Sequence, residues 1–359
     1  MGAVVLAGCL PPKLAPAPAV VTNPPATSPP TPPPSIPAAP GGASTSAVLT
    51  EGTIEDFPDP FVLRVDDPAA CGTDTAPCYY AYSTAAGFWG LTDVPVWRST
   101  NLTTWTWVGT GGNAMPTLAP WVQFGRNWAP SVVYRPDNPT SQQYVMYYVG
   151  WTQNGAPYGG VQCVGVATSA NPDGPFVDTV GAPLICQPSL GDTIDPSPYV
   201  SADGLSLYLS YSNNTGLYAR QLNADGLTFS GSESGSQLLG LSDGYSWDNV
   251  HIEAPTMMST PATGILLFYS SGDFRTSTYR VGTARCDGPL GPCHRLYTTA
   301  VLSSRGSMFG PGGQTPFQVP DGSWRMAFHA WDTTVGYPAG KRSLHFLPLT
   351  FPLNKPKIG

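Results

Sequence analysis

A short pattern recurs five times along this chain, and each time a proline opens a run of apolar residues. In three copies a carboxylate stands one or two residues before the proline: Asp59-Pro60, Asp195-Pro196 and Glu253-Ala254-Pro255. The other two copies carry no acid: Trp128-Ala129-Pro130 and Gln314-Thr315-Pro316. The copies divide the chain from residue 59 onward into segments of similar length. A pattern that returns at this spacing predicts a fold built from repeated units.

Each segment contains short runs rich in β-branched and aromatic residues, separated by turn-forming residues. In the first segment the runs cover residues 60–65, 78–83, 94–99 and 105–108, and the last runs of the second and third segments cover 174–177 and 227–229. Repetition of a four-stranded antiparallel unit predicts an all-β fold, a five-bladed β-propeller, with a β-sandwich as the alternative. In a propeller the first strand of each blade lines the central axis, so the residues leading into those strands gather at one mouth.

The composition favours many strands and tight turns, because Gly and Pro number 40 and 41 among 359 residues and charged residues make up 11%. The net charge of -7 argues against nucleic acid as a partner, since phosphate binding needs clustered Lys and Arg. A neutral polymer suits this chain better. Residues 10–48 are dominated by Pro, Ala, Thr and Ser, which predicts a disordered Pro-rich tether. The expected organisation is a signal remnant at 1–9, this linker at 10–48 and the propeller at 49–359.

The first cysteine stands apart from the others. Cys9 ends the run Leu6-Ala7-Gly8-Cys9, which is similar to a bacterial lipobox, where the cysteine is acylated. The alternative is an incidental cysteine. No later stretch is long and apolar enough to cross a bilayer, so any membrane attachment depends on Cys9. We expect an extracellular or cell-surface protein held by a lipid anchor.

The other cysteines fall into three neighbouring pairs: Cys71 with Cys78, Cys163 with Cys186, and Cys286 with Cys293. The sequence permits many connectivities, but local pairing closes small loops at little strain. Such disulfides indicate an exported protein. A zinc site is the alternative, and it is disfavoured because neither CxxC spacing nor a histidine cluster accompanies the cysteines.

If the propeller forms, the three acids can take part in one reaction. They then converge at one mouth, near aromatic side chains that can stack on a sugar: Phe88, Trp89, Trp128 and Trp247. Cleavage of a glycosidic bond needs a carboxylic acid that protonates the leaving oxygen and a carboxylate on the anomeric side. A third carboxylate raises the pKa of the acid by like-charge repulsion. One acid before a proline is most often a turn or cap residue, but three matching positions favour catalysis.

The order Asp-Pro, Ile-Asp-Pro and Glu-x-Pro resembles glycoside hydrolase family 43, which comprises arabinanases, arabinofuranosidases and β-xylosidases. Supporting runs begin at Val96, Asn127, Leu267, Tyr279 and Met326, and the resemblance covers residues 50–351. It implies that Asp59 is the general base, that Glu253 is the general acid, and that Asp195 tunes the pKa of the acid and orients it. Enzymes of the family invert the configuration at the anomeric carbon, which implies that the carboxylates of Asp59 and Glu253 lie about 6.5–9.5 Å apart.

Two positions qualify this assignment. Many family members carry Gly-His-Asn at the start of the fifth blade, where the histidine approaches an ion on the axis, but here Gly313 occupies the histidine position. We therefore expect no metal, and no other cofactor is implied. His329 is the alternative ligand, although its apolar neighbours favour a hydrogen-bonded core residue.

Asp56 is the chief alternative to Asp59 as the general base. Asp59 is preferred because it directly precedes a proline, as Asp195 does.

The resemblance predicts a secreted or lipid-anchored, monomeric enzyme that acts on a carbohydrate polymer or oligosaccharide. The first expectation is hydrolysis of α-L-arabinofuranosyl linkages of arabinan or arabinoxylan. A β-xylosidase or galactofuranosidase of the same family is the alternative among enzymes. A non-catalytic carbohydrate-binding propeller is the alternative of another class, and the three acids argue against it, because a lectin has no use for a carboxylic acid of raised pKa.

Overall fold

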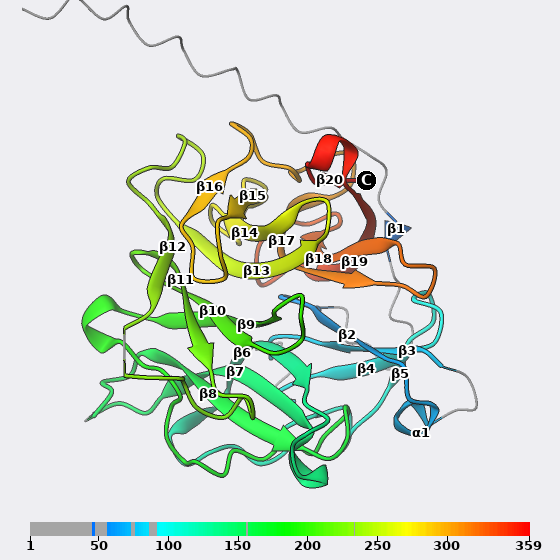
Figure 1. The fold of residues 1–359 in the computed structure, drawn as a ribbon, viewed down its shortest axis with the longest axis vertical. Helices are drawn as coiled ribbons and strands as arrows, with labels where there is room; N and C mark the ends of the chain where they lie inside the picture. The colour runs from blue at the N-terminus through cyan, green and yellow to red at the C-terminus, as the bar shows by residue number, and fades with distance from the viewer. Residues whose placement is uncertain (1–44, 47–55, 73–75, 86–91, 156, 233) are drawn as a thin grey trace, which may run out of the picture. The chain divides into compact units, whose positions relative to one another are not determined.

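The computed structural model describes residues 45–46, 56–72, 76–85, 92–155, 157–232 and 234–359, all within the compact unit Ile36–Gly359. Cys9, Phe88 and Trp89 lie outside the described residues. The described chain forms five antiparallel sheets that follow one another in chain order (Figure 1). No helix in these residues is long and apolar enough to span a membrane.

The sheets are the blades of a β-propeller. The first contains β2 (Phe61–Val65), β3 (Cys78–Tyr82), β4 (Val96–Ser99) and β5 (Thr106–Trp107). The second contains β6 (Val122–Tyr134), β7 (Tyr144–Thr152) and β8 (Gln162–Ser169). The third contains β9 (Thr193–Val200), β10 (Leu207–Asn213), β11 (Gly216–Leu222) and β12 (Ser236–Gly240), and the fourth β13 (Ile252–Thr260), β14 (Gly264–Ser271), β15 (Arg280–Cys286) and β16 (Cys293–Arg295). The fifth contains β17 (Phe309–Gln318), β18 (Trp324–Trp331) and β19 (Arg342–Thr350), with β1 (Thr45–Ser46) and β20 (Lys357–Ile358) both paired to β19.

The expected five blades are confirmed, but two outer strands differ from the expectation. In the second blade, residues 174–177 contribute an isolated bridge between Thr168 and Val177 instead of a fourth strand. In the third blade, the fourth strand is β12, whereas residues 227–229 contribute one bridge between Leu222 and Phe229. A tight turn after β11 explains the second difference, because it returns Phe229 against its own strand, where the Arg220 guanidinium covers the ring at 3.8 Å.

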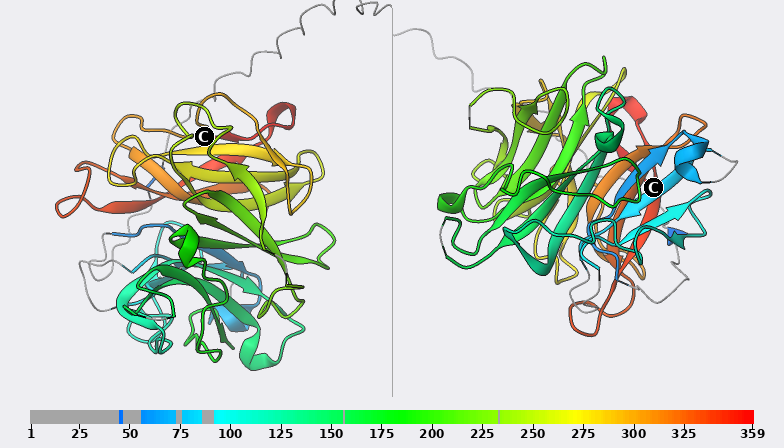
Figure 2. Two further views of the ribbon diagram at one scale, coloured as in Figure 1. Left: turned by 90° about the vertical axis from the view of Figure 1, so that its left-hand side faces the viewer. Right: turned by 90° about the horizontal axis from the view of Figure 1, so that it is seen from below.

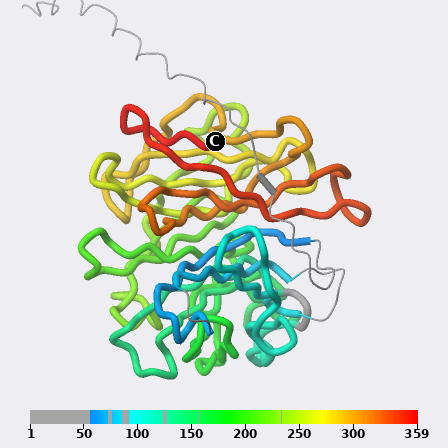
Figure 3. Tube along the Cα trace, turned by 90° about the vertical axis from the view of Figure 1, so that its right-hand side faces the viewer, coloured from blue at the N-terminus to red at the C-terminus, as the bar shows by residue number. Residues whose placement is uncertain are grey.

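The first and last blades lie side by side, which closes the ring (Figure 3). Residues 45–46 fall within the predicted linker, but they form β1 and pair with β19, so these two residues belong to the final blade. On the inner side, the Thr315 hydroxyl of the fifth blade donates to the Pro60 carbonyl of the first at 2.9 Å. The two views in Figure 2 show the same succession of blades from other sides.

The core is divided among five hydrophobic clusters, each shared by two neighbouring blades. Tyr82 and Met146 represent the cluster between the first and second blades, and Trp97 and Phe346 the one between the fifth and first. The apolar side chains of each sheet are therefore buried against the next sheet, and burial of this kind is the main stabilising contribution. This packing fixes the blades around the axis and leaves the inner strands to form the site.

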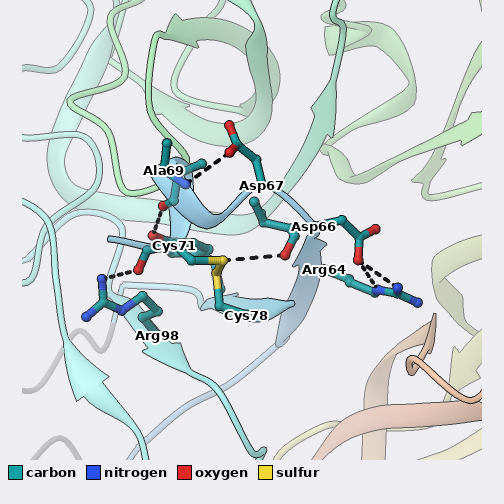
Figure 4. Close-up of a disulfide and its surroundings, with 10 residues drawn as sticks. Arg64, Asp66, Asp67, Ala69, Cys71, Cys78 and Arg98 are labelled. Atoms are coloured by element: carbon teal, nitrogen blue, oxygen red, sulfur yellow. Dashed lines mark hydrogen bonds and ion pairs between the residues drawn. A yellow bond between two sulfur atoms is a disulfide. The ribbon is translucent and has the colours of Figure 1, made fainter. Parts of the chain in front are cut away.

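The structure contains the three disulfides expected from the sequence: Cys71–Cys78, Cys163–Cys186 and Cys286–Cys293. Figure 4 shows the first, which joins the short helix α1 (Pro68–Cys71) to β3. Asp67 caps α1 by accepting from the Ala69 amide at 3.0 Å, and the Arg98 guanidinium donates to the Cys71 carbonyl at 2.6 Å. These contacts attach the helix firmly to the first blade.

Candidate active site

The innermost segments of all five blades share one backbone irregularity. Each contains a residue in the left-handed region: Asp59 (φ 51°), Ala129 (φ 41°), Asp195 (φ 55°), Ala254 (φ 51°) and Gly313 (φ 57°). The pairing register shifts there in β6, β9, β13 and β17, so these are β-bulges, and β2 begins just after Asp59. A non-glycine residue in this region costs about 1–3 kcal/mol and persists only where its surroundings enforce it, which is common at functional sites.

The bulges establish which residues correspond between blades. Asp59 and Asp195 occupy the same position, whereas Glu253 precedes its left-handed residue by one, as Trp128 does in the second blade. In the fifth blade the corresponding residue is Gly313, two residues earlier than the match to Pro316 had suggested. The three acids thus come from three blades at nearly equivalent places.

Side chains hold the backbone amides of four of these residues. Asp59 N–H donates to His329 Nδ1 at 2.9 Å, and Ala129 N–H donates to Thr84 Oγ1 at 2.8 Å. Ala254 N–H donates to Asp195 Oδ2 at 2.8 Å, and Gly313 N–H donates to Ser270 Oγ at 3.0 Å. The network satisfies amides that the bulges leave outside the sheet ladders, and it links neighbouring blades around the axis.

Asp59 is partly buried, with 25% of its side chain exposed. Its Oδ2 accepts from Thr84 Oγ1 at 2.7 Å, and its Oδ1 lies 4.0 Å from Arg342 Nη1. Burial raises the pKa of Asp59, with a smaller contribution from the charge of Glu253, while Arg342 and the Thr84 hydrogen bond oppose the rise. The carboxylate is therefore made more basic than usual, yet a buried cation favours its ionised form.

His329 is fully buried beside Asp59. Burial, and then the charge of Arg342, hold the pKa of His329 well below its usual range, so the imidazole is neutral. Because Nδ1 accepts the Asp59 amide proton, the ring proton is assigned to Nε2. The 3.3 Å approach of Nδ1 to Asp59 Oδ1 is thus not an ion pair. The expectation of a hydrogen-bonded core histidine is confirmed.

Asp195 shows the strongest effect of the shared site. Burial raises its pKa well above the usual range, the charges of Glu253 and Asp59 raise it further, and the hydrogen bond from Ala254 N–H opposes the rise. Oδ2 is fixed by that amide on the next blade, directly after Glu253 in the chain. Asp195 is consequently held toward Glu253 by the backbone that also positions Glu253.

Glu253 has both carboxyl oxygens in contact with side chains, and 12% of its own side chain is exposed. The Tyr279 hydroxyl donates to Oε1 at 2.6 Å, and His251 Nε2 lies 2.8 Å from Oε2. Burial raises the pKa of Tyr279 well above its usual range, and the nearby carboxylates add to the rise, so the phenol remains a donor. Its ring stacks on His329, with centroids 5.8 Å apart.

Asp56 has a different environment from Asp59. It is 2% exposed, its Oδ2 accepts from the Tyr337 hydroxyl at 2.7 Å, and its Oδ1 accepts from the Arg342 amide at 2.8 Å. Burial lowers the pKa of Arg342, but the charge of Asp59, followed by Tyr337 and Asp56, outweighs this and raises it. Asp56 therefore holds the residue that faces Asp59, a contact pattern that favours Asp59 as the base.

The two described aromatic residues that were predicted to stack on a sugar, Trp128 and Trp247, have different surroundings. Trp128 is partly exposed at the position corresponding to Glu253 and meets Trp151 edge to face at 6.0 Å. Trp247 packs flat on Tyr269 at 6.2 Å, and its indole N–H donates to the Thr298 carbonyl at 2.9 Å. Both contacts are typical of a side chain that packs against its neighbours. Stacking of a sugar on Trp247 stays a prediction. Phe88 and Trp89 lie outside the described residues.

With this geometry in place, known families can be compared. The family model for glycosyl hydrolases family 43 matches residues 57–353. This chain belongs to glycoside hydrolase family 43. No curated protein sequence matches it.

Several solved structures share the fold. A thermostable family-43 glycoside hydrolase is 22% identical, with a TM-score of 0.68 over 87% of this chain and 96% of that one. An endo-1,4-beta-xylanase from Bacteroides thetaiotaomicron is 24% identical, with a TM-score of 0.66 over 85% and 94%. An exo-1,5-alpha-L-arabinanase from a bovine ruminal metagenomic library is 18% identical, with a TM-score of 0.61 over 85% and 96%. At these identities the likeness shows the fold alone.

The residues on the axis of this family 43 chain bear on whether it holds a metal ion. Among the described residues, no group of three or more His, Cys, Asp or Glu side chains could hold one. The inner strands enclose a narrow cavity of about 30 Å³, lined by the five bulges and by hydroxyl and amide side chains such as Ser197 and Gln314. Gln314 is already bonded to Ser270 and to the Ala254 carbonyl.

Four residues that contact the acids were not identified from the sequence: Thr84, His251, Tyr279 and Arg342. His251 had a detectable signal, since residues two apart in a strand share a face and Glu253 follows it by two. Thr84, Tyr279 and Arg342 lie 25 or more residues along the chain from the acids that they contact, so local sequence spacing could not identify them.

Proposed function

We propose that this family 43 protein hydrolyses glycosidic bonds with inversion, with Asp59 as general base, Glu253 as general acid and Asp195 as the residue that orients the acid. The observation that carries the proposal is that three acidic residues from three blades meet on the inner strands, where the backbone amide after Glu253 donates to Asp195 and the charges of Glu253 and Asp59 both act on Asp195. The pKa of Asp59 is raised by burial and then by Glu253, and the pKa of Asp195 is raised by burial, Glu253 and Asp59. Strongly perturbed acids at the centre of a ring favour catalysis over structural pairing.

In the proposed reaction, Asp59 takes a proton from a water molecule that attacks the anomeric carbon. Glu253 gives its proton to the leaving oxygen as the glycosidic bond breaks. Thr84 and the amide bonded to His329 hold Asp59 in place, while Tyr279 holds Glu253. Asp195 accepts from the amide that directly follows Glu253, and in this way it orients the acid. A single displacement needs room for water between base and sugar, hence the predicted separation of about 6.5–9.5 Å.

For the substrate we propose α-L-arabinofuranosyl linkages. Support comes from an exo-1,5-alpha-L-arabinanase and an endo-arabinase among the solved structures of the same fold. A second candidate is a β-xylosyl linkage, because an endo-1,4-beta-xylanase of this fold is 24% identical. A galactofuranosidase remains the third possibility within the family.

A substrate panel tests the proposal. Purified protein is incubated with nitrophenyl α-L-arabinofuranoside, β-D-xyloside and β-D-galactofuranoside, and with linear arabinan and arabinoxylan. We expect release from the arabinosides and a loss of about 10²–10⁴ in kcat for Asp59→Asn and Glu253→Gln. Asp203→Asn, in an exposed turn, is the matched control. Binding without release from any substrate would support the carbohydrate-binding alternative and contradict the enzyme.

We also propose that the protein is exported and tethered to the cell surface through acylated Cys9. The three disulfides support export, because such bonds persist in oxidising compartments. Detergent phase partitioning of protein from a bacterial host tests the anchor. We expect the wild type in the detergent phase and Cys9→Ser in the aqueous phase, and equal partitioning would contradict acylation.

A further inference from the structure

One titratable side chain outside the three acids connects the site to solvent. His251 lies just before β13, and 44% of its side chain is exposed, whereas Glu253 is 12% exposed. The two side chains meet at 2.8 Å, between His251 Nε2 and Glu253 Oε2. Ser271 fixes the backbone at this point by donating to the His251 carbonyl at 2.7 Å. A histidine thus stands between bulk water and the predicted acid.

We propose that His251 is a positioning residue that returns the proton to Glu253 after each turnover. The inference deepens the proposed function and rests on it. Tyr279 donates to Oε1, so Oε1 is an acceptor and the transferable proton of Glu253 belongs on Oε2. That is the oxygen in contact with His251. The Oε2–H bond then points to the leaving oxygen of a sugar, and the remaining lone pair of Oε2 accepts from His251.

The proton balance closes over one cycle. Glu253 loses the Oε2 proton to the leaving oxygen and becomes a carboxylate. The imidazolium of His251 then passes its Nε2 proton to Oε2, so an N–H bond breaks and an O–H bond forms. The neutral imidazole takes its next proton from solvent, and Asp59 releases to solvent the proton that it took from the attacking water. The net reaction is hydrolysis of one glycosidic bond.

The charges around His251 suit this role. Its hydrogen bond to Glu253 raises the pKa of His251, burial opposes the rise, and the charges of Glu253, Asp195 and Asp273 add to it. Asp195 approaches from β9 and Asp273 from the loop after β14, where Asp273 is paired with Arg275 at 2.9 Å. Histidine is the side chain whose protonation changes near neutral pH, and the raised pKa favours the imidazolium that supplies the proton to Glu253.

Kinetics of two His251 variants test the inference. His251→Gln can still hydrogen-bond to Glu253 but cannot carry a proton, and His251→Ala leaves space for a small acid. We expect kcat to fall roughly tenfold to 10²-fold in both, with KM little changed. The basic limb of the pH profile should move to lower pH in His251→Gln, and added imidazole should restore kcat of His251→Ala in a saturable manner. His294→Gln is the matched control, because His294 is exposed on the outermost strand of the same blade.

Three results would overturn the inference: full kcat in His251→Gln, a raised KM with unchanged kcat, or no response of His251→Ala to imidazole. A second measurement is independent of turnover. Titration of the His251 ring by NMR should show its pKa falling in Glu253→Gln, and an unchanged titration would contradict a shared proton. If the wild type releases sugar from no substrate, the proposed function fails, and this titration still decides whether the pair shares a proton.

Discussion

Replacement of Gly313 by alanine tests why the fifth blade carries a glycine where two other blades carry an alanine. A Cβ at Gly313 would lie 2.8 Å from Asp59 Cα, from Asp59 Oδ1 and from His329 Nδ1. Ala129 and Ala254 adopt the corresponding conformation, with φ of 41° and 51°, so the bulge itself accepts a Cβ. Close approach of the first blade is therefore the feature that requires glycine.

Two unfavourable terms contribute to the expected loss. The left-handed conformation costs alanine about 1 kcal/mol. An extra methyl group in a packed site costs about 1–3 kcal/mol, because neighbours must shift. We expect the free energy of unfolding to fall by about 2–4 kcal/mol in Gly313→Ala. The displaced atoms belong to the proposed base and its hydrogen-bond partner, so kcat should fall as well.

Gly306→Ala is the matched control, because Gly306 has φ of 55° and nothing within 4 Å of an added Cβ. Denaturant unfolding followed by tryptophan fluorescence gives the stability of both variants, and hydrolysis of a nitrophenyl arabinofuranoside gives kcat. The control should lose about 1 kcal/mol and keep its kcat. Equal stability losses in the two variants, or wild-type kcat in Gly313→Ala, would refute the crowding argument.

Three further predictions concern the residues around the acids. In Arg342→Met, loss of the cation 4.0 Å from Asp59 raises the pKa of the base further, so the acidic limb of the kcat/KM profile should move to higher pH. The control is Arg325→Met, at the other end of the blade, in which the acidic limb should stay in place. An acidic limb that does not move in Arg342→Met would contradict the pairing of Arg342 with Asp59. Asp56→Asn should lower the free energy of unfolding by about 1–3 kcal/mol and reduce kcat less than Asp59→Asn does, whereas the reverse order of kcat would make Asp56 the base. Asp195→Asn keeps a hydrogen-bond acceptor for the Ala254 amide but removes the titratable carboxyl group, so kcat should fall about 10²-fold with little change in KM, and an unchanged kcat would remove Asp195 from the mechanism.

The blades could be predicted from the sequence because each inner strand begins with the same proline pattern and each segment repeats its apolar runs. The third blade shows where that reasoning ends. Residues 227–229 look like a strand, but a tight turn returns them beside β11, and the outer strand forms later, at Ser236–Gly240. The outer strands β5, β12 and β16 are only two, five and three residues long, so their sequence constrains them weakly.

Within the site, the sequence located the acids but not their exact correspondence. Asp59 and Asp195 match, while Glu253 stands one residue earlier, because the bulge in β13 places Ala254 in the left-handed position. The match of Pro316 failed because the bulge in β17 places Gly313 in the left-handed position. Arg342 reaches Asp59 only through the closed ring, and Tyr279 reaches Glu253 across the fourth blade, so no local pattern encodes either contact.

The anomeric configuration of the first sugar released tests the central claim most directly, because it reports how the base, the acid and the bound sugar are arranged. Hydrolysis of an α-L-arabinofuranoside in D₂O is followed by proton NMR before mutarotation. We predict that the β anomer appears first, as expected when a water molecule held by Asp59 attacks opposite the bond that Glu253 protonates. Appearance of the α anomer first would mean a double displacement and would contradict the assigned roles.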